Sequence, residues 1–135
     1  MDNIGEILMN KFIWQDSYNI GNSTIDSQHK YLFKLANKVV AATSKDQISE
    51  CLILLYKYTR EHFQAEEAVM KVHGYPEYDT HVYLHNKMLD KLIKISDSLN
   101  TPHWDKAMID VFMQEWLLVH ILEKDMPLGA YIGTK

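Results

Sequence analysis

Apolar residues recur every three to four positions along four stretches of the chain, which is the period of an amphipathic α-helix. No segment alternates between apolar and polar residues for long enough to predict a strand. The pattern therefore predicts four helices of roughly twenty residues each after an irregular N-terminal arm. Residues that commonly start or stop helices separate the stretches, and they are Ser23, Ser44, Gly74, Pro76, Thr101, Pro102 and Pro127.

Short signals place the ends of these helices. Ser23 with Asp26 and Ser44 with Gln47 resemble capping boxes, in which a serine and a residue three positions later satisfy the first backbone donors. Gly74 predicts the stop of the second helix.

Prolines mark the third and fourth helices. Pro76 suits the first turn of the third helix. Thr101 followed by Pro102 predicts the start of the fourth, which Pro127 should end. Because the connections are short, neighbouring helices must be antiparallel.

The predicted fold is all-α: an up-down-up-down antiparallel four-helix bundle with an irregular N-terminal arm. We expect a single domain over residues 1–135, with the arm at about residues 1–22 and the bundle at about residues 23–126. A chain of 135 residues with 47% hydrophobic and 24% charged residues is sufficient for one ordinary globular core.

Composition and charge exclude several classes of function. The net charge of −4 indicates no basic surface for nucleic acid or an anionic membrane. No apolar run reaches membrane-spanning length, and the N-terminus carries acidic residues where a signal peptide needs a basic flank. A single cysteine, Cys51, cannot form an internal disulfide. We therefore expect a cytoplasmic protein that neither binds nucleic acid nor inserts into a membrane.

Polar residues interrupt the inward-facing apolar line of every predicted helix. A buried polar group without a partner costs on the order of a few kcal/mol. Any one of the histidines among them, taken alone, could be an ordinary core histidine with a hydrogen-bond partner. The residues are His29 in the first helix, His62 and Glu66 in the second, His81 and His85 in the third, and His120 in the fourth.

The heights of these residues along their helices coincide. At ~1.5 Å per residue, His29 lies about 9 Å from the start of the first helix, and Glu66 and His62 lie about 10 and 16 Å from the end of the second. His81 and His85 lie about 6 and 12 Å from the start of the third, and His120 about 8 Å from the end of the fourth. In an antiparallel bundle those ends are the same end, so the six polar residues should converge on one level.

A seventh polar group extends the set. Asp125 follows His120 by five residues, which on an ideal α-helix places the two about 140° apart. Because Pro127 should prevent a regular continuation and push Met126 away from helical angles, we expect the chain to turn Asp125 back beneath His120. The helix dipole disfavours an acid at this end, which favours a positive partner for Asp125.

The donor set is too large for one zinc ion. Five imidazoles and two carboxylates exceed the four ligands of tetrahedral zinc, and the H-E-x-x-H motif is absent. Two metal ions that share bridging carboxylates fit the count. Imidazole with carboxylate suits iron, although ligand type alone leaves manganese open. Two carboxylates and one hydroxide would reduce the charge of two ferrous ions to about +1.

Four short motifs resemble the hemerythrin family in its stand-alone bacterial form: IDSQHKYLF, HFQAEE, HVYLH and HILEKD. The likeness covers essentially the whole chain, including the arm sequence FIWQDSYNIG. It implies a non-haem di-iron protein that binds dioxygen reversibly, with an oxo or hydroxo group between the ions and an open position on one of them. The implied ligands are His81, His85 and His120 for one iron, His29 and His62 for the iron with the open position, and Glu66 and Asp125 as bridges.

Neighbouring residues receive lesser roles. By resemblance, Trp116 and Leu117 would line the oxygen pocket, where an apolar wall slows the loss of superoxide and the entry of water. Periodicity alone equally allows Trp116 a plain core position. Glu67 should point outward as a solvated acid, and we assign neither His73 nor His103 to a metal.

The expected function is reversible binding of dioxygen, as an oxygen carrier, store or delivery protein rather than an enzyme. Neutral imidazoles donate less charge than the glutamates of ferritin-like di-iron proteins, whose Glu-x-x-His motif is absent here. Two alternatives stay open. One is an oxygen or redox sensor that acts through a separate protein partner, and the other is a di-iron enzyme that reduces peroxide or nitric oxide or handles iron.

Overall fold

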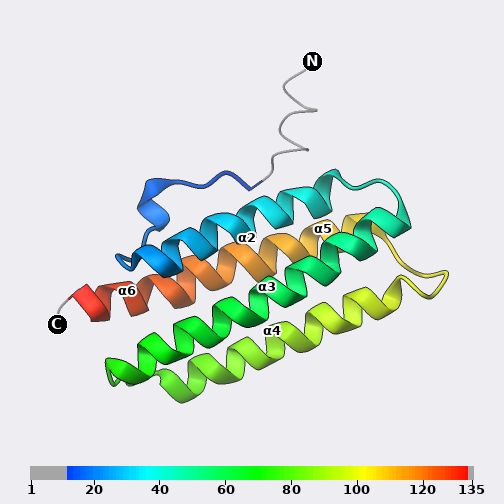
Figure 1. Ribbon diagram of the computed structural model, residues 1–135. Helices are drawn as coiled ribbons and strands as arrows, with labels where there is room; N and C mark the ends of the chain where they lie inside the picture. The colour runs from blue at the N-terminus through cyan, green and yellow to red at the C-terminus, as the bar shows by residue number, and fades with distance from the viewer. Residues whose placement is uncertain (1–11, 134–135) are drawn as a thin grey trace.

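The computed structural model describes residues 12–133 as four long helical runs. Three of them are α2 at Ser23–Ala41, α3 at Lys45–Val72 and α4 at Tyr78–Ser98, and the fourth begins with α5 at Lys106–Gln114. Figure 1 shows the four runs side by side with alternating direction. The described residues contain no strand, and none of their helices is long and apolar enough to cross a membrane. The predicted up-down-up-down four-helix bundle is confirmed.

The start and end of α3 match the sequence signals. The Ser44 side chain accepts a hydrogen bond from the Gln47 backbone N–H at 3.1 Å, and the Gln47 side chain accepts one from the Ser44 N–H at 3.3 Å. The helix ends just before Gly74, whose φ of 63° is a left-handed conformation that favours glycine. Local backbone satisfaction therefore decides both ends of this helix.

α2 begins at Ser23, as predicted, but its N-terminal cap differs from the prediction. Asn22 rather than Ser23 is the N-cap, and its side chain accepts a hydrogen bond from the Ile25 N–H at 3.0 Å. Asp26 accepts hydrogen bonds from the backbone N–H groups of Ile20 at 2.7 Å and Gly21 at 3.3 Å. The acid that resembled part of a capping box therefore holds the arm against the helix.

The connection before the fourth helical run is longer than predicted. The run begins at Lys106 with Asp105 as its N-cap, and the Asp105 side chain accepts a hydrogen bond from the Ala107 N–H at 2.9 Å. Thr101 was expected to cap this run. Its hydroxyl instead donates to the Ser98 carbonyl at the end of α4, at 2.8 Å.

The sequence predicted that the fourth helical run ends at Pro127, and this prediction is wrong. Two π-helical turns, Glu115–Val119 and Ile121–Asp125, follow α5, and α6 continues over Met126–Gly133. Met126 has helical angles, with φ −59° and ψ −43°. Pro127 lies in the first turn of α6, where a missing backbone N–H is tolerated. The proline therefore follows a change of helix type instead of ending the helix.

The N-terminal arm packs against the first and last helices. Phe12 is buried, and its backbone N–H and carbonyl both bond to the Asn37 side chain, at 2.8 and 2.7 Å. At the other end of the arm, a Cβ on Gly129 would lie 2.6 Å from the carbonyl oxygen of Ile20, so α6 approaches the arm this closely because residue 129 is glycine. The part of the predicted arm before residue 12 lies outside the described residues.

The apolar core is divided into two clusters by a layer of buried polar side chains. The larger cluster includes Leu55, Leu92 and Met113, and the smaller includes Ile25 and Leu128. On α2, Ile25 of the smaller cluster and Leu32 of the larger one lie about one turn on either side of His29. The fold therefore places the polar layer within the bundle, with apolar residues above and below it.

Candidate metal centre

Seven polar side chains from all four helical runs meet in this layer. Each of them has at most 6% of its surface exposed. They are the seven residues that the sequence singled out: His29 from α2, His62 and Glu66 from α3, His81 and His85 from α4, and His120 and Asp125 from the π-helical part of the fourth run.

The carboxylate of Glu66 lies between two groups of histidines. Its Oε1 is 2.7 Å from Nε2 of His81 and 3.2 Å from Nε2 of His85. Its Oε2 is 3.3 Å from Nε2 of His62 and 3.6 Å from Nε2 of His29. Each oxygen of the carboxylate therefore faces a different pair of imidazoles.

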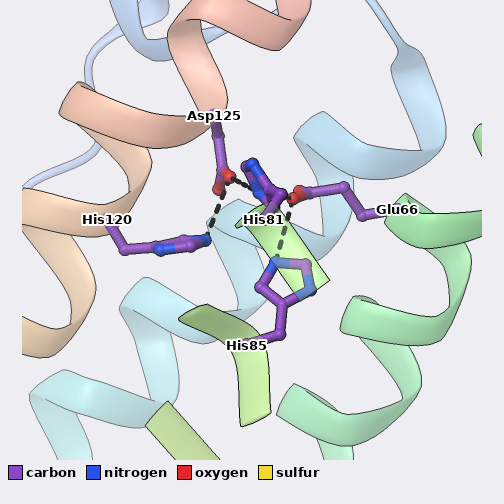
Figure 2. Close-up of side chains that lie close together, drawn as sticks. All are labelled: Glu66, His81, His85, His120 and Asp125. Atoms are coloured by element: carbon purple, nitrogen blue, oxygen red, sulfur yellow. Dashed lines mark hydrogen bonds and ion pairs between the residues drawn. The ribbon is translucent and has the colours of Figure 1, made fainter. Parts of the chain in front are cut away.

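The carboxylate of Asp125 repeats this division from the opposite side. Its Oδ1 is 2.9 Å from Nε2 of His81 and 3.1 Å from Nε2 of His120. Its Oδ2 is 3.1 Å from Nε2 of His29. Figure 2 shows Glu66 and Asp125 pointing toward each other, with the ring of His81 between them. The two acids thus divide the histidines in the same way.

The donor atoms form two sets that share both acids. Within each set the donor atoms lie within 4.8 Å of one another. Two overlapping sets with common carboxylates are the arrangement expected of two neighbouring metal ions bridged by those carboxylates. One set consists of Glu66, His81, His85, His120 and Asp125, and the other of His29, His62, Glu66 and Asp125.

The hydrogen bonding within the layer is incomplete. Buried donors and acceptors without partners are costly, by about 1–3 kcal/mol each. A pair of cations at the centre would satisfy all of these atoms, and the residues present therefore fit two metal ions. The donor atoms that lack a hydrogen-bond partner are Nε2 of His29, His62, His85 and His120, Oε2 of Glu66 and Oδ2 of Asp125.

A π-helical turn brings Asp125 beneath His120. Residues five apart on an α-helix point about 140° away from each other, whereas π-helical bonding runs from residue i to residue i+5 and turns them toward the same side. The turn at Ile121–Asp125 lets Asp125 Oδ1 approach His120 Nε2. The predicted pairing of the two residues is observed, but it comes from a widened helix and not from an irregular chain end.

The charges of the buried acids and imidazoles balance each other. Burial alone would raise the pKa of Glu66, but the surrounding imidazoles hold it well below its ordinary value, and the pKa of Asp125 is also lowered. Burial would lower the pKa values of His29 and His81, but the nearby carboxylates of Asp125 and Glu66 raise both to about 9. For His62 burial dominates and the pKa is lowered. The acids are therefore ionised, and an entering cation would displace protons from His29 and His81.

The family model of the hemerythrin HHE cation binding domain matches residues 21–132. The chain belongs to the hemerythrin family. All seven residues of the polar layer fall within the matched range.

Individual hemerythrins are similar to this chain over most of its length. A bacteriohemerythrin of Clostridium acetobutylicum is 32% identical, over 84% of this chain and 95% of its own. A bacteriohemerythrin of Methylococcus capsulatus is 32% identical, over 81% of this chain and 86% of its own. Myohemerythrin of Riftia pachyptila is also 32% identical, over 82% of this chain and 84% of its own. A His/Glu/Asp metal site suits this family, in which iron is the typical metal.

A small apolar-walled cavity adjoins the donor residues of this hemerythrin domain. Its volume is about 10 Å³, roughly the room that one water-sized molecule needs. Trp116 and Leu117, the two residues singled out for an oxygen pocket, both line it, and the Trp116 indole N–H donates to the Met88 carbonyl at 3.2 Å. The cavity touches His29 and His62 of the smaller donor set, His120 of the larger set, and Asp125, which belongs to both.

Two contacts outside the donor sets were missed by sequence analysis. Nδ1 of His62 lies 2.7 Å from Oε1 of Gln28, and Nδ1 of His85 lies 2.8 Å from Oε2 of Glu67. Glu67 was expected to point into solvent, and its contact with His85 shows that this prediction is wrong. One signal for these contacts was present in the sequence, which is that Gln28 directly precedes the donor residue His29 and Glu67 directly follows the donor residue Glu66.

Proposed function

We propose that this protein binds dioxygen reversibly at a pair of iron ions. In this proposal the two acids bridge the ions, and the smaller histidine group belongs to the ion with an open position. The observation that supports it most strongly is the position of the two carboxylates. Glu66 and Asp125 each present one oxygen to each histidine group. The proposed ligands are His81, His85 and His120 for one iron, His29 and His62 for the other, and Glu66 and Asp125 for both.

The iron pair would supply the electrons that dioxygen binding requires and recover them on release. The protein supplies the surroundings. The smaller donor set has four members against five in the larger, so a ligand position is left for an incoming molecule. Three of those four members, His29, His62 and Asp125, also line the small cavity, whereas the five-member set contributes His120 and the shared Asp125. The geometry therefore favours a diatomic ligand bound on this side.

The apolar wall of the cavity favours binding over turnover. Leu117 is 2% exposed and Trp116 is 5% exposed, so bulk water has little access from this side. The cavity has too little volume for a second organic substrate beside a bound gas. We therefore propose an oxygen carrier, store or delivery protein and not an enzyme.

The test is a cycle of oxygenation and release with the iron-loaded, reduced protein. Dioxygen should produce a visible absorption band, with one dioxygen taken up for each pair of irons, and argon should remove both. The alternatives give different results in the same apparatus. Continuous loss of dioxygen, peroxide or nitric oxide with a supplied reductant would identify an enzyme, and a protein that holds two irons without taking up dioxygen would contradict the proposal.

A further inference from the structure

Two of the buried imidazoles, those of His62 and His85, form hydrogen bonds through Nδ1 to two different chemical groups. His62 bonds to the side-chain amide of Gln28 across the contact between α2 and α3. His85 bonds to the carboxylate of Glu67 across the contact between α3 and α4. The two contacts have nearly the same length, 2.7 and 2.8 Å, so the main difference between them is charge.

The contact from Gln28 determines which nitrogen of His62 carries the proton. The amide oxygen Oε1 is an acceptor only, so Nδ1 of His62 must be the donor. Nε2 is then left without a proton, and it is the atom that faces Oε2 of Glu66 at 3.3 Å without a hydrogen-bond partner. Gln28 therefore holds His62 in the tautomer and orientation that a metal ligand needs.

The location of Gln28 shows why this restraint matters. A surface hollow of about 370 Å³ lies between α2 and α3, and Gln28, Leu32 and His62 all contribute to its lining. Leu32 and His62 also line the internal cavity. His62 thus stands between the hollow and the cavity, and without Gln28 its Nδ1 would face a space that water reaches.

The charge difference distinguishes the two donor sets. A carboxylate behind an imidazole raises its basicity and stabilises a more highly charged metal ion. Glu67 provides this to His85 in the five-member set, whereas Gln28 adds no charge to His62 in the four-member set. The four-member set is therefore the one that is better suited to hold iron in the ferrous state.

We propose that Gln28 is a positioning residue that orients His62 through a neutral hydrogen bond and thereby keeps the iron on the open side ferrous. The proposal rests on the proposed function, because it needs iron in the four-member set. It assigns the opposite role to Glu67, which favours ferric iron through His85. Each iron passes between the two states by gaining or losing one electron.

The experiment uses iron-loaded protein and two measurements besides oxygen binding. The first is the rate at which a ferrous chelator removes iron. The second is the midpoint potential of the iron, titrated against redox dyes that exchange one electron with each ion. The variants are Gln28→Met, which keeps the length but removes the acceptor, Gln28→Glu, which keeps the acceptor and adds charge, and Glu67→Gln, which keeps an acceptor and removes charge.

The expected results separate orientation from charge. Gln28→Met should weaken iron binding about 10- to 100-fold, seen as faster removal by the chelator. Gln28→Glu should retain its iron but lower the midpoint potential, because an added negative charge favours the ferric state. Glu67→Gln should raise the midpoint potential. A purely structural role for Gln28 would not lower the midpoint potential in Gln28→Glu while leaving its iron in place.

Glu61→Gln is the matched control. Glu61 lines the same surface hollow but is exposed, so its charge is screened by water. The potential of this variant should stay at the wild-type value. A rise of the potential in Glu61→Gln as large as the fall in Gln28→Glu, or wild-type iron removal in Gln28→Met, would overturn the proposal. If wild-type protein holds two irons and binds dioxygen while the Gln28 variants behave like it, only this inference fails, whereas wild-type protein without two irons contradicts the proposed function itself.

Discussion

Glu67 accepts a hydrogen bond from Nδ1 of His85 across the interface between α3 and α4, with a distance of 2.8 Å. The face of the His85 ring stacks on Phe63, with ring centroids 3.7 Å apart and an interplanar angle of 4°. The imidazole is thus fixed in both rotation and tautomer before any metal is considered. Glu67 therefore positions the His85 ring from outside the polar layer, whereas its neighbour Glu66 points into the layer.

Glu67→Ala should loosen iron without abolishing its binding. The change leaves Nδ1 of the buried His85 without its acceptor, and losses of this kind typically reduce metal affinity about 10- to 100-fold. The measurement is iron per chain after dialysis against a graded series of chelator concentrations. Full retention at every concentration would show that Phe63 stacking alone holds the ring.

Glu66→Ala should have a much larger effect than Glu67→Ala. It removes the carboxylate whose oxygens face both histidine groups, so both metal positions lose a ligand and a negative charge at once. We expect loss of both irons and no absorption band on exposure to air. The two variants remove the same group from adjacent positions of α3 and therefore serve as controls for each other. A Glu66→Ala protein that keeps two irons would show that Glu66 is not a bridge.

Leu117→Ala should speed autoxidation while leaving iron content unchanged. Leu117 lines the small cavity beside the donor residues, and its truncation would admit water there. Removing this buried side chain should also cost about 2–5 kcal/mol of unfolding free energy, so rates must be compared well below the melting temperature. Val111→Ala is the control, because Val111 lies in α5 of the same helical run, is 54% exposed and does not line the cavity. Equal autoxidation rates in all three proteins would leave Leu117 as a core residue only.

Removal of the metal should lower the melting temperature substantially. The metal-free layer retains several buried polar atoms without hydrogen-bond partners, and metal-binding free energy adds directly to folding free energy. At this chain length each kcal/mol corresponds to on the order of 3–5 °C, so we expect a decrease of about 10 °C or more. Thermal unfolding followed by circular dichroism, with and without iron, tests this. Coincident melting curves would mean that the helices pack equally well around the empty centre.

The amino-acid sequence determined the four helices, their antiparallel order and the level at which the polar residues meet. These features follow from short-range rules, because apolar periodicity defines which side of a helix faces inward and the rise per residue defines height. His62 and Glu66 illustrate this, since their spacing of four puts them on one face of α3 whatever surrounds the helix. The capping box of Ser44 and Gln47 is local in the same sense.

Rules that apply locally gave a wrong end to the fourth helical run. Pro127 stops a regular α-helix, and the sequence indicated nothing else at that position. Packing of Leu128 in the smaller cluster and the close approach of Gly129 to the arm favour a continued helix. The run widens into two π-helical turns before the proline and continues as α6, where Gly129 packs against Ile20 of the arm, a residue distant in sequence.

Only the tertiary structure decided how the polar layer is divided and supported. Which carboxylate oxygen faces which imidazole depends on the relative rotation of all four helical runs, and no periodicity within one helix contains that information. Gln28 and Glu67 show the same limit, because each is a half-buried residue beside a donor, and its partner lies on the neighbouring helix. Hydrogen bonds between helices are set by distances of a few tenths of an ångström, and those distances exist only once the bundle has packed.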